Sequence, residues 1–145
     1  MLGTLLGAVV THTFQRAAAR RSESFAAGQQ LRAERMGVYS EFAGAVTEFR
    51  RGQQDRWHRR HEDPDGTVAF DARVESYRLR GVALQTLFRV RLVASGQPLT
   101  DAAERAYELT GAVHRAADHV ELKVAAQQAR EALEEFIAIA ASDIR

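Results

Sequence analysis

The chain has 145 residues, of which 20 are Lys or Arg and 19 are Asp or Glu, so its formal net charge is +1. This length is typical of one domain, and the near-neutral charge argues against a nucleic-acid binder that works by bulk charge. The absence of cysteine excludes disulfides, thiolate zinc sites and cysteine nucleophiles. With only 2 prolines and abundant alanine, the composition favours an all-α protein over a β-sandwich or barrel.

Three breaks divide the chain into helical segments. The first is the proline turn Glu62–Gly66, the second is the stop Ser95–Pro98, and a weaker one lies near Ala117–His119. The segments between them predict helices over about 2–61, 67–95, 99–117 and 121–143. We therefore expect an antiparallel bundle of about four helices.

Apolar residues recur at helical spacing in the first, third and fourth segments. Their shared faces are Leu31, Val38, Tyr39, Phe42, Ala45, Val46 and Phe49; Leu99, Ala102, Ala103, Ala106, Leu109, Thr110 and Val113; and Leu122, Ala125, Ala129, Ala132, Leu133, Phe136 and Ala140. We expect a common core that contains Phe42, Phe49, Leu84, Phe88, Val113 and Phe136. Replacing Phe88 with alanine is then expected to cost about 3–5 kcal/mol. Asp101 and Glu104 have the spacing of an N-cap with an acidic partner.

The second segment is apolar on two sides. One face carries Phe70, Val74, Tyr77, Leu84, Phe88 and Leu92, and another carries Leu79, Val82, Ala83, Val90 and Val93. A helix that is apolar on two sides is expected to be buried on both. This helix is therefore predicted to lie centrally in the bundle or, alternatively, to contact another subunit.

The first predicted helix is much longer than the others, about 90 Å at 1.5 Å per residue. The other three can cover only the part from about Leu31 to His61. Residues 1–30 are therefore expected to project from a bundle domain formed by residues 31–145.

The projecting part begins with an apolar run that ends in arginines. The residues concerned are Leu2, Leu5, Leu6, Val9, Val10, Phe14, Arg16, Arg20 and Arg21. We favour a membrane anchor, with the arginines on the cytoplasmic side, although a span normally needs about 20 apolar residues. The alternatives are a buried helix end and a coiled-coil or oligomer seam, for which the pair Gly3 and Gly7 offers close packing in lipid.

A basic and aromatic cluster ends the first helix. It consists of Arg56, Trp57, His58, Arg59, Arg60 and His61. Basic residues are favourable at a helix carboxyl end, so we expect a solvated helix end. The alternatives are a patch for an anion or a protein partner, anchored by Trp57, and a metal site at the two histidines. The surrounding arginines would repel a cation, and we expect no metal there.

No motif of a known catalytic chemistry occurs in the sequence. It contains no Glu-x-x-His pair of a di-iron bundle, no nucleophile elbow and no glycine-rich phosphate loop. The long helices do not fit a helix-turn-helix motif. We therefore expect no enzyme activity, no cofactor and no specific nucleic-acid partner.

Five stretches of the sequence match a family pattern: Gly3–Arg16, Tyr39–Arg51, Trp57-His58 with Glu62–Gly66, Tyr77–Ala83, and Tyr107–Thr110 with His114–Asp118. In these stretches the chain resembles the KilB-like family of small proteins from Streptomyces and related actinomycetes. The family label derives from plasmid kil loci, so the resemblance implies a role in plasmid transfer and spread, with no catalytic residues. Lys123 is the single lysine, and the preference for arginine is typical of a high-GC bacterial genome.

Together these features predict a non-enzymatic, membrane-tethered helical bundle on the cytoplasmic side of the cell membrane. It would act through contacts with a protein partner. The alternatives are a soluble, cytoplasmic homo-oligomeric scaffold and a metal- or ligand-binding bundle enzyme. An enzyme should show polar groups that converge in a pocket, whereas a binding module should expose an apolar patch.

Overall fold

The computed structural model describes residues 3–145, with side chains from residue 11 onward. The helices are α1 (Gly3–Glu62), α2 (Thr67–Val93), α3 (Gln97–Ala112) and α4 (His119–Asp143), and a 3₁₀ turn, η1 (Val113–Arg115), follows α3. No strand occurs in this part of the chain, which confirms the all-α prediction. Contacts divide the chain into two units, Met1–Glu34 and Arg35–Arg145, which we describe in turn.

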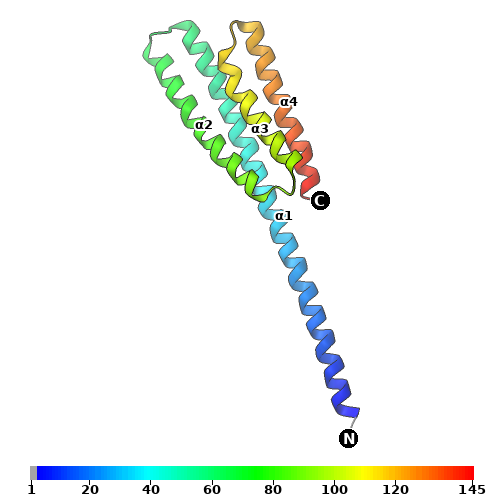
Figure 1. Cartoon of the computed structure of the whole chain (residues 1–145). Helices are drawn as coiled ribbons and strands as arrows, with labels where there is room; N and C mark the ends of the chain where they lie inside the picture. The colour runs from blue at the N-terminus through cyan, green and yellow to red at the C-terminus, as the bar shows by residue number, and fades with distance from the viewer. Residues whose placement is uncertain (1–2) are drawn as a thin grey trace. The chain divides into compact units, whose positions relative to one another are not determined.

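The second unit is a four-helix bundle of residues 35–62 of α1 with α2, α3 and α4 (Figure 1). The short connections between these helices make sequence neighbours antiparallel. Pro98 lies in the first turn of α3, where the missing N–H costs nothing. At the start of α4, the Asp118 side chain accepts the backbone N–H of Glu121 at 2.8 Å and so caps the helix.

The predicted cap of the third helix is wrong. Helix α3 begins at Gln97, two residues before the predicted start, because the chain already turns at Gly96. Asp101 therefore lies inside the helix, where its Oδ1 accepts a hydrogen bond from Gln97 Nε2 at 2.6 Å. At the other end, η1 replaces the last predicted turn of this helix.

The core lies between all four helices and is centred on aromatic rings. Phe136 of α4 is fully buried, and its ring centroid lies 4.8 Å from that of Phe42 and 6.0 Å from that of Tyr39. Both pairs meet edge to face, the arrangement that aromatic quadrupoles favour. Small residues of α3, such as Ala103 and Ala106, are also fully buried and let the helices approach closely. Most residues of the predicted faces of α1 beyond Leu31, of α3 and of α4 thus belong to this core.

Helix α2 differs from its prediction. Its buried residues are mostly small, including Ala69, Ala72, Ser76 and Ala83, whereas Phe88 is 48% exposed. Small residues allow α2 to lie close to its neighbours. Val90 of the second predicted face is buried in the core with Ala83 and Leu87, whereas most large residues of the first predicted face are exposed. Helix α2 is therefore not buried on two sides, the predicted central position is wrong, and Phe88 does not belong to the core.

A smaller apolar cluster closes the far end of the bundle around Trp57. The indole ring is 2% exposed and packs with Val113, Ala116 and Leu122. Its Nε1 donates a hydrogen bond to the backbone oxygen of Ala116 at 2.7 Å. This bond ties the end of α1 to the chain between η1 and α4. Val113, predicted for the common core, belongs to this cluster.

A polar network fastens the opposite end. The Tyr39 hydroxyl donates to Asp143 Oδ2 at 2.6 Å, and Arg35 Nε lies 3.8 Å from the same oxygen. Arg35 Nε also donates to the backbone oxygen of Val93 at 2.9 Å. Burial, followed by the hydrogen bond to Asp143, raises the pKa of Tyr39 well above its usual value. The network joins the ends of α2 and α4 to α1.

The first unit is the amino-terminal part of α1. Every side chain from residue 11 to residue 34 is exposed, including Phe14, Phe25 and Leu31. Leu31 is therefore not a core residue, because the contacts of the bundle begin only at Arg35. Leu2 and the side chains of Leu5, Leu6, Val9 and Val10, predicted for the anchor, lie outside the described residues.

The described part of the chain contains no helix that is long and apolar enough to span a membrane.

Candidate functional site

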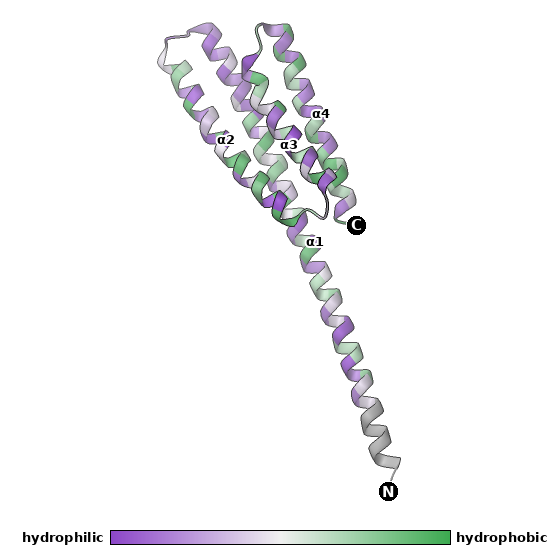
Figure 2. Ribbon diagram, in the orientation of Figure 1, coloured by the Kyte–Doolittle hydropathy of each residue, from purple (hydrophilic) through white to green (hydrophobic). Residues whose placement is uncertain are grey.

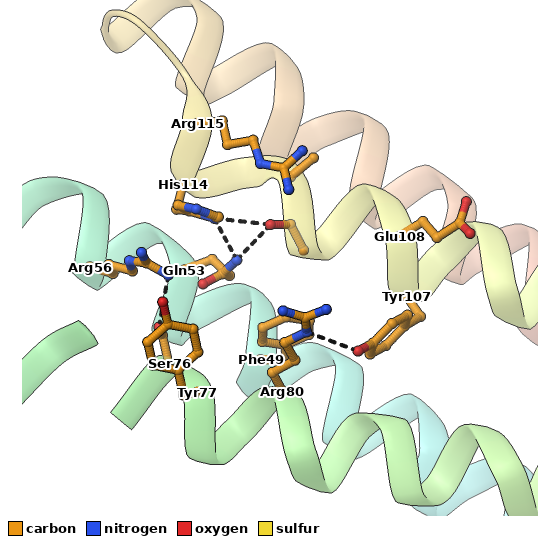
Figure 3. Close-up of a pocket in the computed structure, with 12 residues that line it drawn as sticks. Phe49, Gln53, Arg56, Ser76, Tyr77, Arg80, Tyr107, Glu108, His114 and Arg115 are labelled. Carbon is orange, nitrogen blue, oxygen red and sulfur yellow. Dashed lines mark hydrogen bonds between the residues drawn. The ribbon is translucent and has the colours of Figure 1, made fainter. Parts of the chain in front are cut away.

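A polar pocket opens between α1, α2 and the corner formed by α3 and η1. Its volume is about 400 Å³. Arginines from three elements line it, namely Arg56 of α1, Arg80 of α2 and Arg115 of η1, and Glu108 is the only acidic residue among the lining residues (Figure 3). The aromatic wall consists of Phe49, Tyr77 and Tyr107. The pocket is thus both cationic and aromatic.

The floor of the pocket is a buried hydrogen-bond cluster. Gln53 is 3% exposed, and its Nε2 donates to the backbone oxygen of Gly111 at 2.8 Å. His114 Nδ1 lies 2.9 Å from the same carbonyl oxygen and 2.9 Å from Gln53 Nε2. Burial, and then the charge of Arg56, lowers the pKa of His114 below its usual value of 6.5. The hydrogen bond with the Gly111 carbonyl oxygen opposes this lowering of the pKa, and the charges of Arg115 and Arg60 add to it.

Two of the lining arginines are held by neutral groups. Arg80 Nε donates to the Tyr107 hydroxyl at 3.1 Å. The Arg56 guanidinium lies over the Tyr77 ring, 5.2 Å from its centroid, and contacts the Ser76 hydroxyl at 3.4 Å. None of the ion pairs found among residues 11–145 involves Arg56, Arg80 or Arg115. Their positive charge is therefore not neutralised by the bundle itself.

The predicted basic cluster at the end of α1 is split by the structure. Trp57 is buried and cannot anchor a partner, and His61 stacks on it with a centroid distance of 3.8 Å. Arg59 is paired with Asp55 and Glu62 on the helix surface. His58, Arg59, Arg60 and His61 are exposed, as expected of a solvated helix end. Arg56 instead lines the pocket, and Arg60 also contacts the His114 carbonyl oxygen.

The histidines near this end lie close together without a full ligand set. The His58 and His119 ring centroids are 5.8 Å apart. No group of three His, Cys, Asp or Glu side chains in the described region is placed to hold a metal ion. That His58 and His61 bind no metal stays a prediction.

A second feature is the outer surface of α2, which we call the α2 apolar face. It consists of Phe70, Val74, Tyr77, Phe88 and Leu92, all exposed. At 100° per residue these positions fall within one stripe along the helix. Leu92 is 83% exposed, and Figure 2 shows apolar residues recurring along α2. Contiguous exposed apolar surface of this kind marks interaction sites.

Comparison with known proteins identifies the family. A family model described as KilB plasmid transfer protein matches residues 36–144. The chain belongs to the KilB plasmid transfer protein family. The KilB match begins one residue after the start of the second unit, so it covers the bundle with both the pocket and the α2 apolar face. No curated protein and no solved structure matched the chain.

The sequence singled out only part of this site. Arg56 belonged to the basic cluster and Tyr77 to the apolar pattern of α2. Arg80 and Arg115 lay in stretches that resemble the family but were not predicted as site residues, and Gln53 lay in no motif. They are separated by long stretches of sequence, and only the packing of α1, α2 and η1 brings them together. A signal for Gln53 did exist: it continues the buried stripe of Val46 and Phe49 at helical spacing.

Proposed function

We propose that this KilB family member acts in plasmid transfer as a membrane-tethered helical bundle, without catalysis of its own. The bundle would bind a protein partner through the α2 apolar face. The observation that carries the proposal is that face, because it leaves five large apolar side chains exposed on one helix. Their burial in a complex would be favourable at roughly 25 cal/mol per Å² of apolar surface.

The partner contact predicts a selective loss of plasmid transfer. We expect that Phe88→Ser combined with Leu92→Ser lowers the transfer frequency at least about tenfold, since central apolar contacts of an interface are worth more than 1–2 kcal/mol. Both side chains are exposed, so the free energy of unfolding should change by less than about 2 kcal/mol, part of which is the lower helix propensity of serine. The measurement is mating frequency in a host whose plasmid spread requires this protein.

The control for this experiment is Val124→Ser on α4. Val124 is 51% exposed, close to the exposure of Phe88, but lies on another helix. It should leave transfer unchanged. Equal losses in both variants, or no loss in the α2 variant, would contradict the proposal.

A second candidate is a homo-oligomer formed through the same face. Phe70, Val74, Tyr77, Gly81, Leu84 and Phe88 alternate in steps of four and three residues, the spacing of a coiled-coil seam. Gly81 has open space in front of it, so a second helix can approach closely at the middle of the stripe. Sedimentation of the wild type and of the α2 variant separates the two candidates. Only the homo-oligomer predicts a concentration-dependent dimer that the variant abolishes.

The tether predicts a different localisation for a shortened chain. Deleting residues 1–22 removes the apolar run and its arginines, so the protein should move from the membrane fraction to the soluble fraction. The melting midpoint should stay within about 2 °C, because the side chains of residues 11–34 are exposed and stabilise nothing in the bundle. The measurements are cell fractionation with and without a high-salt wash, and circular dichroism. A full-length chain found only in the soluble fraction would overturn the tether.

A further inference from the structure

We propose that the pocket between α1, α2 and η1 binds a small molecule that carries a phosphate group. The group would be held by Arg56, Arg80 and Arg115, with the organic part against Tyr77 and Tyr107. This inference is independent of the proposed function, because neither the tether nor the partner contact requires a ligand.

The pocket concentrates positive charge. Three guanidinium groups from three elements face one pocket, against a single carboxylate, that of Glu108. The three pocket arginines form no ion pair among the described residues. Some arginines outside the pocket, such as Arg50 and Arg73, also form none, so what distinguishes the three is that they line the same pocket. An anionic ligand would supply the missing charge.

Two of the three arginines are held in place by neighbouring side chains. Arg80 is held through Nε by Tyr107, and no hydrogen bond among the described residues uses its two terminal nitrogens. Arg56 is held over the Tyr77 ring, with Nη1 near Ser76. Guanidinium groups fixed in this way lose little entropy when they bind, and their planar donors match phosphate oxygens in pairs. Figure 3 shows the hydrogen bond between Arg80 and Tyr107.

The size of the pocket and the residues that line it also suit an organic phosphate. A volume of about 400 Å³ exceeds what a bare phosphate needs and lies in the range of pockets for small organic ligands. The tyrosine rings offer flat apolar surface for a planar group. Gln53 and Ser76, both buried, add polar groups at the floor. The chemistry therefore favours a phosphorylated molecule with a planar part over a carboxylate, since a dianion neutralises more of the arginine charge.

The experiment is calorimetric titration of the full chain with inorganic phosphate, pyrophosphate and AMP, supported by titration of vesicles with and without phosphatidylglycerol. We expect binding of AMP in the micromolar to millimolar range, tighter than that of inorganic phosphate. Arg80→Gln and Arg115→Gln should each weaken it about tenfold, the effect of losing one charge-assisted hydrogen-bond pair. Binding only to anionic vesicles, lost in the same variants, would identify a lipid headgroup as the source of the phosphate.

The matched control is Arg78→Gln, which removes the same charge from the same helix. Arg78 is exposed and paired with Glu75 outside the pocket, so it should change the affinity less than twofold. If Arg78→Gln weakened the binding of AMP as much as the pocket variants do, the arginines would only attract anions non-specifically, and the proposal would be overturned. It would also be overturned by the absence of binding for all three soluble probes together with either no vesicle binding or vesicle binding that Arg80→Gln and Arg115→Gln leave unchanged, since the amino-terminal tether alone can hold the chain on a vesicle. Unchanged circular dichroism spectra of the variants establish that they fold.

Discussion

Replacing Trp57 with alanine should lower the free energy of unfolding by about 3–5 kcal/mol. The indole ring is 2% exposed and forms the centre of the cluster with Val113 and Leu122. The substitution leaves a large cavity at the end of the bundle. It also leaves the backbone oxygen of Ala116 without the N–H that now lies 2.7 Å away. The measurement is urea unfolding followed by circular dichroism, because Trp57 is the only tryptophan and its fluorescence is lost with it.

Two further variants separate packing from hydrogen bonding. Trp57→Phe keeps a ring but removes the donor, so about 1–3 kcal/mol of the loss should remain. His58→Ala changes the exposed neighbour and should stay within about 0.5 kcal/mol. If Trp57→Ala lowered the free energy of unfolding by less than about 1 kcal/mol, Trp57 would not be packed in the interior at this end of the bundle.

The position of Trp57 shows how a local pattern can mislead. The residue lies among arginines and histidines near the carboxyl end of α1, which indicated a solvated surface. The longer pattern indicated the opposite, since Phe49, Gln53 and Trp57 follow one another at steps of four and are all buried. Helical spacing carried across the whole of α1 would have placed Trp57 in the interior.

The helices themselves follow from local signals. Proline and glycine at the breaks fix where α2 and α3 begin, and the buried stripes of α1, α3 and α4 follow from their apolar spacing. The orientation of α2 does not follow in this way. Two apolar faces compete on it. The buried face carries Ala69, Ala72 and Ser76 near the start of the helix and Ala83, Leu87 and Val90 further along, whereas the face with Phe70 and Phe88 is exposed. No rule based on hydrophobicity alone predicts that outcome.

The pocket is even harder to predict from the sequence than the orientation of α2. Arg80 stands two residues after Arg78 on the same helix, yet one lines the pocket and the other pairs with Glu75 on the surface. What distinguishes them is the direction in which each side chain leaves α2, together with the positions of α1 and η1. Those positions are set by long-range packing around Phe49 and Val113.

The orientation of α2 has a direct consequence for stability, which two matched substitutions measure. Phe136→Ala should cost about 3–5 kcal/mol, because the ring is fully buried and contacts both Phe42 and Tyr39 edge to face. Phe88→Ala removes the same atoms, but the ring is 48% exposed, so its cost should stay below about 1 kcal/mol. The measurement is the difference between the two in urea unfolding at equal protein concentration.

A difference of at least about 2 kcal/mol between the two variants is expected. Equal costs would mean that α2 turns its phenylalanines inward after all, and the α2 apolar face would not exist. Dilution adds a further check on Phe88. In a monomer its small cost should not depend on protein concentration, whereas burial of Phe88 against a second copy would make the cost grow as the concentration rises. The same pair of variants therefore tests both the packing of the bundle and the occupant of its outer face.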